Sequence, residues 1–433
     1  MRFFIIKLNN ILKFYCFPFK IQYSFLMKVQ EEKKSEQNAT NPLSQGGKKK
    51  IAILHDAFLY RGGGERLVTL MAKSLHADLI SGFFSDGSFD PRELGFEGAI
   101  IPLGKPVFMK WLRHMLLKWR FMRGAKMLSS YDIVIFSGNC LDAIRHVRAD
   151  AQKIYYCHTP PRYLFDFRDA YLAHIPFFIR PLFRYVFARH REKYKRQLRE
   201  FDIIFTNSKN VHDRLLRFCD IESEILYPPT DIHHFVPTQD ERIKNDPLTQ
   251  DLSLSKNDYF EKYFLSFSRL SPPKRVDLIV DAFIDMPEEN LILTYGKNDP
   301  EKEKILTLIE GKSNIIALES PDDGALISLI QGATASIYIP IDEDFGMAPV
   351  ESMACGTPVI GANEWGLRET IYDPTTGKLI DIFDPASGIE SLKYVVKNIK
   401  SDQWKGMRRD CILRATDFSL EKFEKKLKWH LEL

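Results

Sequence analysis

The chain has 433 residues, a formal net charge of +4 and 45% hydrophobic residues. Such a length is long for a single hydrophobic core and natural for two domains, and this hydrophobic content is ordinary for a soluble protein. The 6 cysteines are scattered without the spacing of a metal site, which argues against a metal centre and favours a reduced cytoplasmic setting.

The first 48 residues are predicted to be an N-terminal extension, partly disordered. Residues 1–27 are apolar and aromatic, but three lysines and Pro18 interrupt them too often for a helix that spans a bilayer. This stretch is either a surface anchor or a segment before the true translation start at Met27. Residues 31–50 are polar and are predicted to be a disordered lead-in.

A strand, a glycine-rich turn and a helix then follow in order. Residues 49–56 are predicted to be a buried strand, and the turn holds Gly63 and Gly64 before an amphipathic helix begins. Glycines let backbone amides approach a phosphate or an acceptor closely. A lone glycine run is more often a flexible loop, and the order of the elements is what makes a binding turn the better interpretation here.

Two stretches join basic residues to aromatic ones, residues 105–126 and residues 180–199. Amphipathic basic helices with Trp and Phe suit an anionic membrane surface. The alternative is a core-facing apolar stripe with a solvated basic back, and for the second stretch both readings are kept. No nucleic-acid-binding motif accompanies the charge, so a nucleic acid partner is not expected.

Residues 154–166 run from a predicted strand into a proline-stopped loop that carries His158. A histidine there can donate a hydrogen bond to a sugar hydroxyl or a phosphate, although a lone histidine is more often packed under its own loop. Another strand is predicted near residues 201–208. The polar, charged residues 238–257 without periodicity are predicted to be a hinge.

A second strand-and-loop unit begins at residues 263–267. The following loop carries Arg269 and Lys274 before an amphipathic helix. An arginine fork and a lysine charge together neutralise a diphosphate, whereas alone on a loop they are usually solvated charges.

The most informative stretch follows the short strand at residues 335–340. Glu343 lies in the loop after this strand, and Glu351 lies early in a helix that starts after Gly346. The free amides of such a helix start attract a diphosphate, and carboxylates on either side accept hydrogen bonds from sugar or ribose hydroxyls. For two glutamates alone, an ordinary loop acid and a first-turn residue would be the better interpretation. The residues predicted to border the anion are Phe345, Gly346 and Met347.

Three segments together resemble one family. Residues 343–360 resemble the Glu-x7-Glu signature of family 4 glycosyltransferases, including the Ala-Cys-Gly-Thr-Pro-Val-Ile that follows it, and residues 268–277 resemble the Gly-Arg-Leu and Lys-Gly segment. Ser268 and Arg275 replace glycines common in that pattern. Trp365 likewise stands in the first glycine position of the Gly-Gly-x-x-Glu turn. The motifs are closest to those of bacterial mannosyltransferases of O-antigen and cell-envelope glycan assembly.

The alternation of strands and helices predicts an α/β fold with parallel sheets. The resemblance implies the GT-B architecture, with two Rossmann-like domains that face each other across a cleft. The expected parts are an extension at 1–48, an acceptor domain at 49–237, a linker at 238–258, a nucleotide-sugar domain at 259–418 and a C-terminal helix at 419–433.

The resemblance also implies a function. We expect a retaining, metal-independent hexosyltransferase, with mannose favoured, that moves a sugar from a nucleoside diphosphate, GDP-mannose favoured, to a lipid-linked or cell-envelope glycan such as lipopolysaccharide. It would act as a peripheral protein on the cytoplasmic face of the membrane and use no cofactor. In this reading Arg269 and Lys274 stabilise the leaving diphosphate, Glu343 orients the sugar, Glu351 holds the ribose and His158 lies near the donor sugar.

Two alternatives remain at this stage. Two carboxylates also serve glycoside hydrolysis, but that reaction leaves Arg269 and Lys274 without a role. The other is an inactive glycosyltransferase-like subunit that binds a membrane partner through its basic helices.

Overall fold

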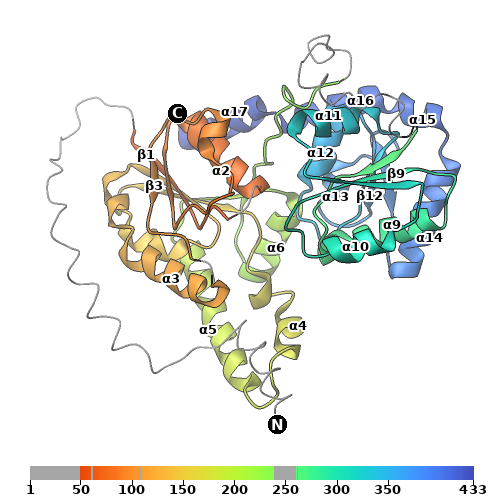
Figure 1. The fold of residues 1–433 in the computed structure, drawn as a ribbon. Helices are drawn as coiled ribbons and strands as arrows, with labels where there is room; N and C mark the ends of the chain where they lie inside the picture. Colours follow the sequence, from red (N-terminus) through yellow and green to blue (C-terminus); the bar gives the residue numbers. More distant parts are fainter. Residues whose placement is uncertain (1–48, 60–61, 108, 238–259, 261) are drawn as a thin grey trace. The chain divides into compact units, whose positions relative to one another are not determined.

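The structure is a computed structural model in which residues 49–59, 62–107, 109–237, 260 and 262–433 are described. These residues form two parallel β-sheets with helices on their faces (Figure 1). The chain divides into two compact units, Met1–Ile204 and Phe205–Leu433. The predicted extension at 1–48 and the predicted linker at 238–258 lie outside the described residues.

The first sheet has seven strands in the order β3-β2-β1-β4-β5-β6-β7. All residues of β1 and β4 are buried, as expected of parallel strands covered on both faces, and Ile53 pairs in register with Ile135. The strands are β1 (Ile51–His55), β2 (Asp78–Ser81), β3 (Ile100–Pro102), β4 (Ile133–Ser137), β5 (Gln152–Cys157), β6 (Ile203–Thr206) and β7 (Glu224–Ile225).

Helices cover this sheet on two sides. In Figure 1 α2 lies on one side of the strands, and α3 and α5 lie on the other. The helices are α2 (Gly63–Leu75), α3 (Lys110–Arg123), α4 (Arg168–Ala173), α5 (Arg180–Leu198) and α6 (Lys209–Cys219), with the 3-10 turns η1 (Pro91–Leu94), η2 (Lys126–Ser130), η3 (Leu141–His146) and η4 (Arg162–Leu164).

The second sheet has six strands in the order β10-β9-β8-β11-β12-β13. Its neighbouring strands are parallel, for example Ile316 of β10 opposite Ile292 of β9. The strands are β8 (Phe264–Ser266), β9 (Leu291–Tyr295), β10 (Ile315–Glu319), β11 (Ser336–Tyr338), β12 (Val359–Ala362) and β13 (Gly377–Ile380).

Helices enclose the second sheet as well. In Figure 1 α11, α12 and α16 lie on one side of it, and α9, α10 and α14 lie on the other. The helices are α9 (Val276–Ile284), α10 (Lys302–Leu308), α11 (Asp323–Gly332), α12 (Met347–Ala354), α13 (Leu367–Thr370), α14 (Pro385–Asn398), α15 (Ser401–Gly406), α16 (Arg408–Ala415) and α17 (Leu420–Leu431), with the 3-10 turns η5 (Pro272–Lys274) and η6 (Thr416–Phe418).

The strand order reverses direction once in each sheet, between β1 and β4 in the first and between β8 and β11 in the second. At such a switch point the loops leave the carboxyl ends of neighbouring strands in opposite directions, and a ligand site opens between them. The fold therefore points to one position in each unit where functional side chains gather.

The last helix returns to the end of the first sheet. Lys426 Nζ of α17 donates a hydrogen bond to the Ile225 carbonyl of β7, and the ring of His430 packs edge-on against Phe205 of β6. A helix thus occupies the C-terminal segment where one was predicted.

Candidate functional site

Three side chains meet at the switch point of the second sheet. Lys274 Nζ lies 2.7 Å from Glu343 Oε2 and 2.6 Å from the Tyr338 hydroxyl, which itself lies 3.0 Å from the same Glu343 oxygen. Tyr338 ends β11, Glu343 lies in the loop after it, and Lys274 ends η5 in the loop after β8. Two of the predicted site residues are therefore in direct contact, joined by a tyrosine that the sequence did not single out.

The pKa of Tyr338 also depends on Glu351 and Arg269, the other two charged residues predicted for this site. Burial raises the pKa of Tyr338 well above its usual range, the carboxylates of Glu343 and Glu351 raise it further, and Arg269 lowers it. Electrostatic influence decays with distance, so Glu343, Glu351 and Arg269 are near enough to the phenol to shift its pKa. Direct contacts join Lys274, Tyr338 and Glu343.

The Lys274 ammonium contacts two side chains and has one further hydrogen-bond donor. Its side chain is 19% exposed and that of Glu343 is 24% exposed, so the pair borders solvent. An ammonium has three donors, and two of them point to Tyr338 and Glu343 among the described residues. A third donor remains for an anionic ligand, whose approach the positive charge favours.

The loop into α12 has the left-handed backbone that glycine permits. Gly346 has a φ of 87°, and a β-carbon there would lie 2.6 Å from Leu367 Cδ2. The buried side chain of Phe345 packs against Tyr227 and Phe418, which leaves its backbone as the part available to a ligand. The half-buried Met347 is the first residue of α12, so the positive end of the helix dipole lies at the predicted anion site.

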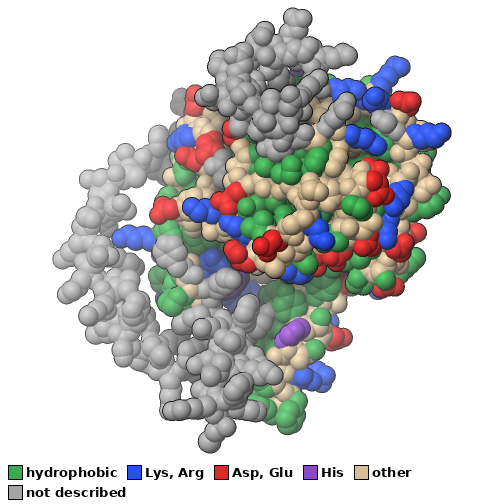
Figure 2. Space-filling model, turned by 45° about the vertical axis from the view of Figure 1, so that its right-hand side comes forward, with side chains coloured by type: hydrophobic (Ala, Val, Ile, Leu, Met, Phe, Trp, Pro, Cys, Tyr) green, Lys and Arg blue, Asp and Glu red, His purple; other side chains and the backbone are tan. Residues whose placement is uncertain are grey.

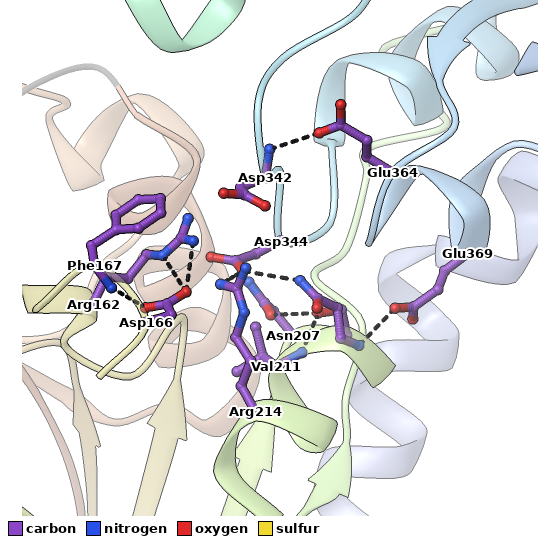
Figure 3. A network of polar contacts seen from close by, with 12 residues as sticks. Arg162, Asp166, Phe167, Asn207, Val211, Arg214, Asp342, Asp344, Glu364 and Glu369 are labelled. Atoms are coloured by element: carbon purple, nitrogen blue, oxygen red, sulfur yellow. Dashed lines mark hydrogen bonds and ion pairs between the residues drawn. The ribbon is translucent and has the colours of Figure 1, made fainter. Parts of the chain in front are cut away.

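A second polar network, which the sequence reasoning missed, surrounds the start of α6 (Figure 3). Asp344 accepts hydrogen bonds from Arg214 at 2.6 Å and from the Asn210 side chain at 3.2 Å. Glu369 accepts from the backbone amides of Lys209 at 2.7 Å and Asn210 at 2.8 Å. Glu369 therefore acts as an anion at a helix N-terminus.

Glu369 has a further donor in the Tyr227 hydroxyl, at 3.2 Å. Burial raises the pKa of Glu369, and its amide and phenol donors oppose that rise. Glu369 is the glutamate of the Gly-Gly-x-x-Glu turn that the sequence analysis identified. The sequence showed this turn but did not show that Glu369 contacts the start of α6.

Another chain of contacts lies at the switch point of the first sheet. His158 Nε2 lies 2.8 Å from Ser137 Oγ, and His55 Nδ1 lies 3.2 Å from the same oxygen. His55 Nε2 lies 3.3 Å from Asp56 Oδ1. A β-carbon on Gly64 would lie 3.8 Å from His158 Cε1, so the start of α2 borders the half-buried His158 ring.

These heavy-atom contacts favour one arrangement of the protons. Burial lowers the pKa of His158 to about 4, with a further decrease from His55, so His158 is neutral near pH 7. The Asp56 carboxylate favours a proton on His55 Nε2, which leaves His55 Nδ1 to accept from the Ser137 hydroxyl. Ser137 in turn accepts from His158 Nε2–H, and His158 Nδ1 then carries a lone pair. The geometry thus favours a histidine that accepts a hydrogen bond, whereas the sequence predicted a donor.

The basic stretch at residues 105–126 is only partly a surface. Phe121 is 1% exposed, and Arg120 donates to the carbonyls of Gly82 and Lys105. Met115 and Trp119 are exposed, at 44% and 46%. The interpretation of residues 105–126 as a membrane surface predicts that Phe121 is exposed with the other aromatic residues, and this is wrong, because the side chain is buried against the core.

Comparisons with known proteins agree with this geometry. Residues 255–415 match the family described as "Glycosyl transferases group 1". The C-terminal region is a glycosyltransferase group 1 domain. It contains the Lys274, Tyr338 and Glu343 cluster, and the protein is a glycosyltransferase.

Several curated proteins are similar to this chain at low identity. "Alpha-1,3/1,6-mannosyltransferase ALG2" of Kluyveromyces lactis is 25% identical over 386 residues, which cover 75% of this chain and 71% of that protein. The ALG2 protein of Dictyostelium discoideum is 25% identical over 76% of this chain and 85% of its own length. "Serotype-specific mannosyltransferase WbdA" of Escherichia coli is 25% identical over 53% of this chain, which spans 29% of WbdA.

Solved structures share the fold. The Anabaena protein Alr3699/HepE in complex with UDP and glucose has a TM-score of 0.63 and 17% identity, covering 89% of this chain and 100% of its own. Sucrose-phosphate synthase from Thermosynechococcus elongatus has a TM-score of 0.68 and 16% identity, covering 89% and 98%. The predicted GT-B fold of two Rossmann-like domains is confirmed.

Two of the three residues that replace glycines of the family pattern have left-handed backbone, whereas Ser268 does not. Arg275 has a φ of 52° and Trp365 a φ of 40°, both in the left-handed region that favours glycine. Gly366 has no such φ, but a β-carbon on it would lie 2.1 Å from the Asp344 carbonyl oxygen. The two non-glycine residues thus adopt the glycine-like conformation, and Gly366 is required by close packing.

Proposed function

We propose that the protein transfers mannose, with retention of configuration, from GDP-mannose to a lipid-linked or cell-envelope glycan. The observation that carries this proposal is the contact among Lys274, Tyr338 and Glu343 beside Arg269 and Glu351, because it joins cations for a diphosphate to carboxylates for hydroxyls. Mannose is favoured because the similar proteins ALG2 and WbdA are named mannosyltransferases.

In this proposal the anomeric C–O bond of the donor breaks and the electron pair leaves with the diphosphate. Arg269, the third donor of Lys274 and the amides at the start of α12 stabilise the charge that develops on the leaving group. The departing phosphate oxygen takes the proton of the acceptor hydroxyl, whose oxygen bonds to the same face of the sugar. One proton thereby passes from the acceptor hydroxyl to the departing phosphate, and no other base is needed.

The carboxylates and the histidine have separate roles around the sugar. Glu343 accepts from hydroxyls of the mannose and Glu351 from those of the ribose. His158 Nδ1 accepts from another donor-sugar hydroxyl, because Ser137 binds its Nε2–H. The backbones of Gly63 and Gly64 approach the ligand at the start of α2.

The nucleotide is proposed on two grounds. The HepE structure holds UDP and glucose, which supports a nucleoside diphosphate sugar for a fold of this type. Guanine is favoured over uracil because mannose is the favoured sugar. No cofactor or metal ion is part of the proposed reaction, since Arg269 and Lys274 offer the positive charge.

The acceptor side is proposed to lie at the cytoplasmic face of a membrane, in assembly of lipopolysaccharide or a related glycan. Among the described residues, no helix is long and apolar enough to cross a bilayer. Attachment would therefore be peripheral for this part of the chain, through basic and aromatic surface residues.

An inactive subunit is the competing function. An inactive relative would have no need to keep Lys274 and Glu343 in contact at a solvent-bordering position, and this pair is intact. Detection of transfer would exclude it.

The test is a panel of nucleotide sugars incubated with the full chain and a lipid-diphosphate-linked glycan, with product analysis by NMR. We expect GDP-mannose to be the preferred donor and the anomeric configuration to be retained. Glu343→Gln keeps the side-chain shape and removes the charge, so its lower activity would tie the product to this site. Preference for another donor, or an inverted product, would contradict the proposal.

A further inference from the structure

The turn between α4 and α5 carries the densest group of exposed apolar side chains among the described residues. It lies at the lower end of the molecule in Figure 1, away from the strands of its sheet, and Figure 2 shows hydrophobic side chains beside basic ones at that end. The exposed fractions are 77% for Phe177, 61% for Phe178, 60% for Leu182 and 62% for Tyr185.

The hairpin does not need these side chains for its own packing. Leu172 and Ile175 are buried beneath it, and the Phe187 ring packs edge-on against Tyr163 at 5.6 Å and Phe183 at 6.1 Å. The rings of Phe177 and Phe178 pack edge-on against each other at 5.7 Å and remain largely exposed. Exposed apolar groups that lie together in this way mark an interaction surface.

The turn is also held in one shape. The Arg180 guanidinium donates from Nε to the Ile175 carbonyl at 2.7 Å and from Nη2 to the Ala173 carbonyl at 3.0 Å. Because the backbone is already ordered, binding through Phe177 and Phe178 loses little conformational entropy.

The turn and the first part of α5 carry basic residues and no acidic ones. Residues 170–191 contain no aspartate or glutamate. A cavity of about 410 Å³ beside α5 is lined by Arg168, Arg184 and Arg191, with Asp169 as its acid. The helical rise of about 1.5 Å per residue places Arg191 about 10 Å along α5 from Arg184, so the cavity follows the helix away from its apolar end.

We propose that the α4–α5 turn enters an anionic lipid bilayer end-on, with Phe177 and Phe178 among the acyl chains and the arginine-lined cavity receiving a lipid phosphate. The order of the features along the hairpin matches the order of a bilayer, with an apolar end followed by positive charge at headgroup depth. This inference rests on the membrane attachment in the proposed function and assigns it to a different element from α3.

Other exposed aromatic residues lack this setting and provide a matched control. Phe383 is 86% exposed and lies between Asp381 and Asp384, and Tyr394 is 69% exposed on α14. The aspartates beside Phe383 oppose an anionic surface. The lysines beside Tyr394, Lys393 and Lys397, are already paired with carboxylates, so neither aromatic residue should contribute.

The first test is sedimentation of the full chain with vesicles of equal parts phosphatidylglycerol and phosphatidylcholine. The double variant Phe177→Ser and Phe178→Ser should weaken binding by at least about tenfold, and Arg184→Glu with Arg189→Glu should do the same in low salt. The control Phe383→Ser with Tyr394→Ser should bind as the parent does, and vesicles of phosphatidylcholine alone should bind the parent weakly.

A second test reports on the turn itself, so an anchor elsewhere in the chain does not mask the answer. An environment-sensitive dye is attached at Phe178→Cys, Met115→Cys or Phe383→Cys, and the signal of the unsubstituted parent is subtracted. We expect a blue shift with anionic vesicles only for the label at 178. A shift at 115 without one at 178 would overturn the proposal, as would vesicle binding unaffected by both turn variants.

The outcome is separable from that of the proposed reaction. Transfer to a short water-soluble acceptor should be equal in the parent and in the serine variants, because the turn touches none of the proposed site residues. If the parent transfers no mannose but the dye enters the bilayer, the reaction fails and the surface stands. If the variants instead change self-association and not vesicle binding, the surface joins two copies of the chain and the lipid proposal is wrong.

Discussion

The two switch points of this protein gather different chemistry. In the second sheet Lys274 and Glu343 form a charged pair around the Tyr338 hydroxyl. In the first sheet Ser137 joins two imidazoles, and burial keeps His158 neutral at pH 7. The same position in two similar folds thus holds a charged cluster in one unit and a neutral hydrogen-bond chain in the other.

This difference matches the two parts of the proposed donor substrate, a charged diphosphate and a neutral sugar. A diphosphate gains negative charge as it leaves, and fixed cations stabilise that charge best. In the proposed function a sugar hydroxyl, which stays neutral, has the neutral His158 as one acceptor besides the Glu343 carboxylate, and His158 adds no second charge to be desolvated. Topology thus sets where side chains gather in each unit, and the local residues set whether the cluster is charged or neutral.

The largest expected effect comes from removing a cation of the charged cluster. Lys274→Ala and Arg269→Ala should each lower turnover by about tenfold to a thousandfold, the range for losing one stabiliser of a developing negative charge. Lys393→Ala removes a lysine whose surface ion pairs are with Asp285 and Glu390 and should leave turnover unchanged. A folded Lys274→Ala enzyme with parental turnover would remove that residue from the mechanism.

The neutral cluster should be visible in the pH dependence of stability. His158 has a folded pKa of about 4, below its ordinary value of 6.5, so the folded state binds that proton less readily than the unfolded state. The contribution of His158 to the free energy of unfolding should therefore be constant above pH 6.5. It should fall as the pH decreases from 6.5 toward 4.

Urea unfolding of the parent and of His158→Gln over this range measures the effect. The variant cannot take up that proton, so it should lose less stability than the parent as the solution is acidified. Equal losses in the two proteins would show that His158 keeps an ordinary pKa, and the contrast between the two clusters would weaken.

A smaller effect concerns the backbone that supports the charged cluster. Arg275 has a φ of 52°, and its side chain pairs with Glu364 at 2.9 Å. Arg275→Gly and Arg275→Ala both lose that pair, but only glycine relieves the left-handed strain, so the glycine variant should be more stable by about 1 kcal/mol. Calorimetric unfolding compares the two, and a more stable alanine variant would mean that the residue does not hold this conformation in solution.

Removal of divalent metal ions is expected to have no effect on the transfer rate. If Arg269 and Lys274 supply the positive charge for the diphosphate, a chelator should leave the transfer rate unchanged. Assay in EDTA checks this, with Lys274→Ala assayed in parallel. Strict dependence on added Mg²⁺ or Mn²⁺ would assign the charge to a metal ion and reduce the cluster to a positioning role.

The sequence predicted the sheets and the charged residues well, for physical reasons. Buried parallel strands such as residues 51–55 leave a continuous apolar run, and loops after such strands lie at one edge of the sheet. Arg269, Lys274, Glu343 and Glu351 were therefore expected together. Lys274 and Glu343 are in direct contact, and the binding role of all four stays a prediction.

The sequence could not reveal contacts that depend on long-range packing. In the sequence Tyr338 has the pattern of an ordinary strand residue. In the structure its hydroxyl contacts Lys274, which is 64 positions away. Ser137 and His55 are separated by 82 positions, and nothing in the sequence indicated that Ser137 lies between His55 and His158. Phe121 reads as part of a surface stripe, but the packing of α3 turns it inward.

The central claim, that Lys274 of the charged cluster holds the diphosphate whereas His158 contacts only the sugar, is tested most directly by calorimetric titration of GDP into three proteins. Lys274→Ala should bind GDP about tenfold to a hundredfold more weakly than the parent, as expected for losing a hydrogen bond to a charged group. His158→Ala should bind GDP as the parent does. Equal loss of GDP affinity in both variants, or loss in His158→Ala alone, would contradict this division.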